Sequence, residues 1–208
     1  MPVNMERRAL IALGLLWLGG VRAVAAIDVT GLWSAAVRSR GGLGYQLTFT
    51  ATEAALTFGA LIDLKYEIAG NKIKMTSGGP DGPPLSSLIA REFTIDGDKL
   101  TIDQGDAGPP MVMTRVGVAH AGAHPIVGDW TYMHKTGVPA VQRYGRGDNA
   151  QLSVPFETSK GPYRIEGETM HVQLDGRQPL ALKIKREGNM LTTTERSGKD
   201  VTYVKFEY

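Results

Sequence analysis

The chain has 208 residues, of which 42% are hydrophobic, with 23 basic and 21 acidic side chains and no cysteine. Without cysteine there is no disulfide framework, so stability has to come from hydrophobic packing. Residues 1–26 hold three arginines and one glutamate, and the rest of the chain has 20 basic and 20 acidic side chains. This balance gives no reason to expect nucleic acid or an anionic membrane as a partner.

The first 26 residues have the layout of a secretory signal peptide. Two arginines precede an apolar run over residues 9–21, and small residues at 24–26 (VAA) supply a cleavage site. The run is too short for a membrane span, which needs about 20 residues. We therefore expect cleavage after Ala25 or Ala26, a periplasmic or secreted location, and no stable membrane span afterwards. The absence of cysteine also argues against a lipoprotein.

The remaining chain contains a repeat that begins at its tryptophans. Trp33 in TGLWSAA and Trp130 in VGDWTYM are 97 positions apart, and YEIAGNKIKM (66–75) lies over YRIEGETMHV (163–172) at the same offset. FTIDGDKLTI (93–102) then matches IKREGNMLTT (184–193) at an offset of 91. Four matched blocks in one order indicate duplication.

The last matched block places Arg115 in MVMTRV over Lys205 in VTYVKF, at an offset of 90. The drop in offset means that the first copy has residues without a counterpart in the second, and these fall within or near SGGPDGPP (77–84). Such a Gly- and Pro-rich segment reads as a loop, and loops tolerate insertions. The sequence thus predicts one unit over 27–117, a Gly- and Ala-rich linker over 118–124, and a second unit over 125–208.

Each unit is dominated by alternation of apolar and polar residues, the period of a half-buried strand. Gly-containing turns between the alternating runs favour antiparallel hairpins. About eight strands are expected in each unit, and no sustained helical period occurs. The expected strands are 31–37, 45–50, 54–58, 64–68, 71–76, 89–95, 99–103 and 111–116, followed by 128–134, 140–145, 150–156, 162–166, 169–174, 180–186, 189–195 and 202–208.

An all-β fold follows from this pattern. Eight short antiparallel strands in chain order are best satisfied by an up-and-down barrel, which closes its own edges. A sandwich of two packed sheets is the alternative, because hairpin patterns do not distinguish the two.

The Gly-x-Trp on a first strand, the meander of hairpins and the basic residue on the last strand together resemble the lipocalin-like (calycin) barrels of bacterial proteins. In that superfamily the tryptophan closes one end of the barrel and packs against an Arg or Lys from near the end of the chain. The resemblance implies two small tandem barrels, with Trp33 paired to Arg115 and Trp130 paired to Lys205. A cation over an indole contributes about 0.5 to 2 kcal/mol.

Candidate ligand-binding residues follow from the same strands. If both tryptophans point into their barrels, the residues two and four positions later do so as well. In the first unit these are Ala35 and Val37, and in the second they are Tyr132 and His134. The phenol and the imidazole could orient a polar group of a ligand. The alternative for His134 is a hydrogen-bonded core histidine or one at the barrel mouth.

Other motifs carry no chemistry. His120 and His124 flank AGA without a third metal ligand, the Asp-rich segment 96–106 departs from calcium-loop spacing, and RGD at 146–148 falls at a hairpin turn. No G-x-S-x-G, H-E-x-x-H or cysteine nucleophile occurs. We expect no catalytic residue, no metal and no cofactor.

The sequence therefore predicts an exported, non-enzymatic binding protein for a small, mostly apolar ligand. The rival hypothesis is a protein-interaction or inhibitor module with filled barrels, which would act through loops such as 77–84 and 134–144 on an envelope protein. An enzyme comes third. Whether the barrels are hollow or filled depends on side-chain volumes, and no oligomeric state is predicted.

Overall fold

The computed structural model describes residues 27–77, 90–134 and 136–208. The predicted signal peptide lies outside the described residues, as does most of the Gly- and Pro-rich segment 77–84. The described part is an all-β structure whose only helical element is a 3-10 turn at Gly105–Ala107. None of its residues forms a helix that could cross a membrane.

In the described residues, fourteen strands follow one another around a closed antiparallel ring, in which β1 also pairs with β14. The strands are β1 (Gly31–Ala35), β2 (Leu43–Phe49), β3 (Glu53–Ala69), β4 (Lys72–Ser77), β5 (Arg91–Asp96), β6 (Lys99–Ile102), β7 (Met111–Val116), β8 (Gly128–Met133), β9 (Pro139–Tyr144), β10 (Asn149–Glu166), β11 (Thr169–Val172), β12 (Leu180–Glu187), β13 (Met190–Thr194) and β14 (Asp200–Lys205). The predicted meander of antiparallel strands is confirmed.

Two strands are much longer than the sequence pattern predicted. The expected strands 54–58 and 64–68 are one continuous strand, β3, and the expected strands 150–156 and 162–166 are one continuous strand, β10. The described residues therefore form seven strands in each unit, one fewer than the number of about eight that the pattern predicted. The intervening residues stay extended because β3 and β10 pair with each other over most of their length, which satisfies their backbone hydrogen bonds.

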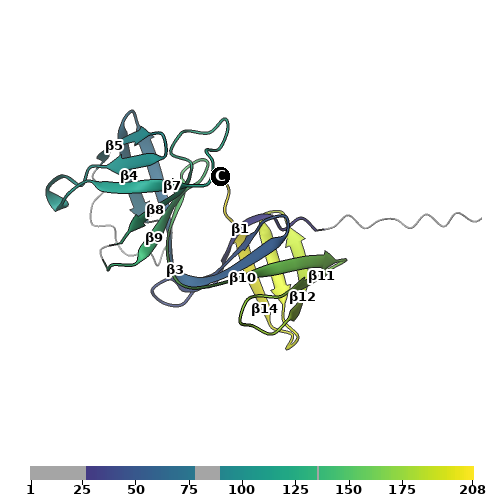
Figure 1. Ribbon diagram of the computed structural model, residues 1–208. Coiled ribbons are helices and arrows are strands. Elements are labelled where there is room, and N and C mark those ends of the chain that lie inside the picture. The colour runs from purple at the N-terminus through teal and green to yellow at the C-terminus, as the bar shows by residue number, and fades with distance from the viewer. Residues whose placement is uncertain (1–26, 78–89, 135) are drawn as a thin grey trace, which may run out of the picture.

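The β3–β10 pairing crosses the ring and divides it into two lobes (Figure 1). The middle lobe consists of the second half of β3, the strands β4 to β9, and the first half of β10. The terminal lobe consists of β1, β2, the first half of β3, the second half of β10, and β11 to β14. The middle of the chain therefore builds one lobe, and its two ends together build the other.

Each lobe encloses a hydrophobic cluster drawn from both predicted repeats. The middle-lobe cluster contains Leu64, Tyr66, Ile73, Phe93, Leu100, Ile102 and Met113 from the first repeat, with Ile126, Val127, Trp130, Tyr144 and Ala150 from the second. The terminal-lobe cluster contains Val29, Trp33, Ala35, Phe49 and Ala54 from the first repeat, with Met170, Val172, Leu174, Ile184, Leu191 and Tyr203 from the second. The repeats at 27–117 and 125–208 thus do not coincide with the two cores.

A β-bulge keeps both halves of β10 in phase with their cores. Pro155 lies opposite Gly59 and Glu157 lies opposite Phe58, which leaves Phe156 as the extra residue. A bulge shifts the alternation of a strand by one residue. The even-numbered Leu152 therefore packs on the middle-lobe cluster before the bulge, and the odd-numbered Tyr163 packs on the terminal-lobe cluster after it. The two backbones approach closely here, because a Cβ at Gly59 would meet the Val154 carbonyl oxygen.

Candidate functional site

Trp33 lies in the hydrophobic cluster of the terminal lobe, beside two cationic side chains. Its indole is fully buried and its Nε1 donates a hydrogen bond to the carbonyl oxygen of Val29 at 2.6 Å. Lys205 is its neighbour on β14, with Nζ 5.3 Å from the ring centroid, and Arg186 of β12 lies 5.6 Å from the same centroid. Two cations therefore flank this indole.

Trp130 makes equivalent contacts in the middle lobe. Its Nε1 donates to the carbonyl oxygen of Ile126 at 2.7 Å, and the guanidinium carbon of Arg115 lies 4.1 Å from its ring centroid. Arg115 also donates to the carbonyl oxygens of Pro125 at 2.7 Å and Val127 at 3.2 Å. The tryptophan–cation pairs are thus exchanged relative to those that the family resemblance implied, because the first strand of each repeat pairs with the last strand of the other repeat.

The glycine of each Gly-x-Trp makes room for the cation. Gly31 has a φ of 117° and Gly128 a φ of 136°, values that side-chain-bearing residues rarely adopt. A Cβ at Gly31 would lie 2.9 Å from Cε of Lys205, and one at Gly128 would lie 3.1 Å from Nη1 of Arg115. The repeated motif is therefore a structural device, in which the tryptophan supplies a ring and the glycine supplies the space above it.

The predicted ligand-binding residues do not form one site. Ala35 is buried in the terminal-lobe cluster, whereas Val37 lies beyond the end of β1 and is 86% exposed. Beyond the end of β1, Arg38 turns back, and its Nε donates to the carbonyl oxygen of Ala35 at 3.1 Å. Tyr132 packs against the middle-lobe cluster, and burial raises its pKa. His134 follows β8 in a surface turn, where its Nδ1 lies 2.8 Å from the Thr136 hydroxyl.

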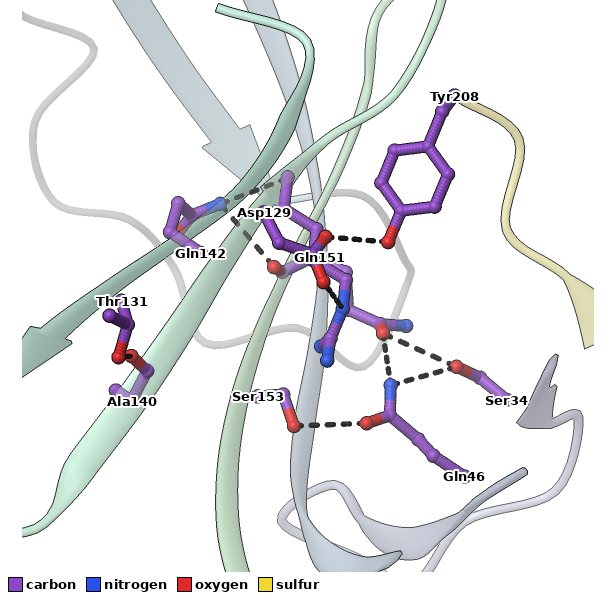
Figure 2. A network of polar contacts seen from close by, with 10 residues as sticks. Ser34, Gln46, Asp129, Thr131, Ala140, Gln142, Gln151, Ser153 and Tyr208 are labelled. Carbon is purple, nitrogen blue, oxygen red and sulfur yellow. Dashed lines mark hydrogen bonds and ion pairs between the residues drawn. The ribbon is translucent and has the colours of Figure 1, made fainter. Parts of the chain in front are cut away.

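A buried polar network fills the seam between the two lobes (Figure 2). The Gln46 amide nitrogen on β2 donates to Oε1 of Gln151 on β10 at 2.5 Å and to Oγ of Ser34 at 3.1 Å. Ser153 donates in turn to Oε1 of Gln46 at 3.1 Å, and the Gln151 amide nitrogen donates to Asp63 at 2.8 Å. Because β2 and β10 are not neighbours in the ring, this network joins the lobes through their outer faces.

The residues after β14 extend the seam. The Phe206 N–H donates to the Leu32 carbonyl oxygen at 2.8 Å, and the Arg146 N–H donates to the Glu207 carbonyl oxygen at 3.2 Å. The segment 206–208 is therefore bonded to β1 in one lobe and to the β9–β10 turn in the other. RGD at 146–148 lies in that turn, as predicted, and Asp148 forms an ion pair with Lys65 at 2.7 Å.

Tyr208 completes this bridge in the middle lobe. Its hydroxyl donates to Oδ1 of Asp129 at 2.5 Å, and its ring stacks on His120 with centroids 4.6 Å apart. Burial raises the pKa of Tyr208, and the negative charge of Asp129 adds to the increase. Arg143 lies 3.4 Å from the other oxygen of Asp129.

An open groove of about 680 Å³ lies where this bridge meets the terminal lobe. Three cationic side chains line it with one carboxylate and two aromatic rings. The lining residues are Thr30, Gly31, Leu32, Arg146, Arg186, Gly188, Asn189, Lys205, Phe206, Glu207 and Tyr208. The groove thus contains residues of both lobes, and its volume is in the range of small-molecule sites, roughly 300 to 1,000 Å³.

The positive charge of the groove is partly balanced at one edge. Arg186 Nη1 donates to the Asp28 carbonyl oxygen and lies 3.3 Å from its carboxylate. The pKa of Asp28 is held below its ordinary value, mainly by hydrogen bonds from Thr30 and to a smaller extent by Arg186 and Lys205. Within the described residues, neither Arg146 nor Lys205 makes an ion pair. These two cations are available to a ligand.

A second groove, of about 470 Å³, lies over β10, β11 and β12. Its lining includes Tyr163, His171 and Leu180. His171 is already paired with Glu166, at 3.4 Å, so this groove has fewer polar groups to offer a ligand. No cluster of three or more His, Cys, Asp or Glu residues suited to a metal ion occurs in the described part of the chain.

Sequence reasoning missed most of the groove. The sequence pattern places Arg146 only in a turn, and Arg186 and Asn189 only in a hairpin, because these residues belong to separate connections of the second repeat. The signal that could have found part of it is the repeat itself, since Arg186 lies over Ile95 at the offset of 91, so that a charge replaces an apolar residue. No protein-family model, curated protein or solved structure matches this chain.

Proposed function

We propose that this chain is an exported, non-enzymatic binding protein whose two lobes are lipocalin-like barrels, each assembled from both repeats. The tryptophan–cation closure at one end of each lobe supports this proposal. The ligand site that we propose is the groove between the lobes. The observation that carries it is the meeting of Arg146, Lys205 and Tyr208, from two lobes, around one hollow of ligand size.

The barrel interiors are less suited to a ligand than the sequence suggested. Trp33, Leu191, Trp130, Leu100 and Met113 are fully buried within the two clusters. Protein interiors are packed as densely as organic crystals, so such side chains leave little room beside them. The ligand therefore belongs in the groove and not on Ala35 or Tyr132.

Native mass spectrometry of the protein purified from its own envelope tests this proposal. We expect a bound small molecule that Asn189→Trp displaces, because Asn189 lines the groove in a Gly-Asn hairpin. Asn71→Trp is the matched control, since Asn71 follows Gly70 in a similar hairpin of the middle lobe. A protein without any bound molecule, or one whose ligand survives Asn189→Trp, would contradict the groove as the site.

A second candidate function is protein interaction, favoured by an aromatic patch near the bulge of β10. The ring of Phe58 lies 5.1 Å from that of Tyr45 and 6.1 Å from that of Phe156. Phe156 is 58% exposed, and exposed aromatic groups of this kind occur at interaction surfaces. A pull-down from periplasmic extract checks it. A partner that the parent protein recovers and the Phe156→Ser variant does not would favour this function. Equal recovery of the partner by the parent protein and the variant would exclude the patch as the interaction surface.

A further inference from the structure

We propose that the groove between the lobes recognises an organic anion, a small molecule with a carboxylate or phosphate group and an apolar body. This inference rests on the proposed function and names the ligand class of its site. The anionic group would lie against Arg146 and Lys205, and the apolar body against Phe206 and Tyr208.

Local charge is the first argument. The chain without its first 26 residues has equal numbers of basic and acidic side chains, so a random surface hollow would carry little net charge. The groove instead gathers the cationic side chains of Arg146, Arg186 and Lys205, with Glu207 as its one acidic side chain. A concave surface lined by one sign of charge concentrates counter-ions and raises the rate at which a charged ligand arrives.

Comparison of the two repeats is the second argument. Arg115 and Lys205 occupy the same position in the duplicated pattern, but their surroundings differ. The side chain of Arg115 is only 3% exposed, and its guanidinium donates to the backbone carbonyl oxygens of Pro125 and Val127. Lys205 is only partly buried and lines the groove. One copy of the closure has therefore sealed its cation, whereas the other presents it to solvent.

The state of the three cations assigns their roles. Arg186 already forms an ion pair with Asp28. It therefore holds the edge of the groove in place, and its positive charge is less available to a ligand than those of Arg146 and Lys205. Arg146 is exposed, and its backbone is held in place by the carbonyl oxygen of Glu207. Arginine presents a planar fork that suits carboxylate and phosphate oxygens, so Arg146 is the specificity residue.

The aromatic side chains of the groove are the reason for proposing a ligand with an apolar body. Phe206 and Tyr208 make an edge-to-face contact with ring centroids 5.0 Å apart, and both rings are half-buried. Tyr208 is fixed from behind by His120 and Asp129. A rigid aromatic wall beside two available cations favours an anion with a ring or a short apolar chain over a fully hydrated inorganic ion.

Titration calorimetry with three probes tests the inference: phenyl phosphate, phenylacetate and neutral 2-phenylethanol. We expect the two anions to bind at least about tenfold more tightly than the alcohol, since hydrogen bonds to charged groups are the stronger ones. Their affinity should fall as salt is added, because the groove is open to solvent. Arg146→Gln should weaken both anions about tenfold.

The control is Arg196→Gln, which removes the same charge from the β13–β14 turn, at the end of β14 opposite to Lys205, and should leave binding unchanged. Equal binding of the alcohol and the anions, or no binding of any probe, overturns the anionic class, whatever native mass spectrometry finds. Tight anion binding that survives both Arg146→Gln and Asn189→Trp places the anion elsewhere and overturns this inference. A bound native ligand displaced by Asn189→Trp would still support the proposed function in either case.

Discussion

Lys205 faces Trp33 across the β1–β14 ladder, with its Nζ 5.3 Å from the centroid of the indole. The two residues belong to opposite ends of the described chain, and the pairing of their strands closes the ring. Arg115 and Trp130 make the equivalent contact within the middle of the chain. The long strands β3 and β10 cause this arrangement, because each passes from one lobe into the other.

Separate fragments test this exchange. We expect residues 27–117 and 125–208, expressed apart, to lack cooperative unfolding, since each hydrophobic cluster needs both fragments. Mixing them should restore a β-sheet circular dichroism spectrum and one unfolding transition. A fragment 27–117 that folds as a stable monomer would show that its own strands can close a barrel, and would contradict the need for exchange.

The glycines of the two Gly-x-Trp motifs should be sensitive to alanine. Gly31→Ala and Gly128→Ala should each lower the free energy of unfolding by about 1 to 3 kcal/mol, because each places a Cβ against a cation at an unfavourable φ. Gly176→Ala is the control, since Gly176 has a φ of 70° with open space around it. It should cost about 1 kcal/mol. Urea unfolding measures all three, and equal losses would refute the steric part of the argument.

The buried amides of the seam should be energetically coupled. Gln46→Leu and Gln151→Leu should each cost about 1 to 3 kcal/mol, because each removes one hydrogen bond of the other buried amide. The double variant should cost less than the sum by about 0.5 kcal/mol or more. A double-mutant cycle from urea unfolding gives the coupling. Strict additivity would mean that the two amides do not depend on each other.

Stability should fall at alkaline pH. Burial raises the pKa of Tyr144 in the middle lobe and of Tyr203 in the terminal lobe. Groups with a raised folded pKa contribute stability that is fully present below the unfolded pKa, about 10, and that is lost as pH rises above it. Each such tyrosine should add a slope of about 1.4 kcal/mol per pH unit between pH 10 and the folded value.

Tyr144→Phe checks this dependence, because phenylalanine cannot ionise. Its free energy of unfolding should decline less steeply between pH 10 and 12 than that of the parent protein, and absorbance at 295 nm should show tyrosinate appearing together with unfolding. Parallel declines in the two proteins would show that Tyr144 does not ionise on unfolding.

Strand positions could be predicted from the sequence because alternation is a local property. Trp33 and Trp130 were correct landmarks for the same reason, since each marks a first strand with its glycine. Alternation does not reveal where an extended segment ends, however, and the expected strands left out Gly59 and Gly161, which both lie within long strands. The cationic partner of each tryptophan depends on where these strands end, so the pairing could not be predicted from the sequence.

The groove and the seam were beyond sequence reasoning for a related reason. Gln46 and Gln151 occupy outward positions on their strands, where a polar residue fits a solvent-facing surface equally well. Only the packing of one lobe against the other buries them. Arg146 and Lys205 likewise meet only because the segment 206–208 crosses from the terminal lobe to the β9–β10 turn.

The pairing of β1 with β14 also sets an order of events for a chain that emerges from its amino end. The middle lobe is complete once β10 is available, whereas the outer edge of the β1–β2 hairpin has no partner until β14 is available. Contacts between distant parts of a chain form slowly because they require closure of long loops. We therefore expect the middle lobe to assemble first, and the first strands of the chain to be the last to find their place.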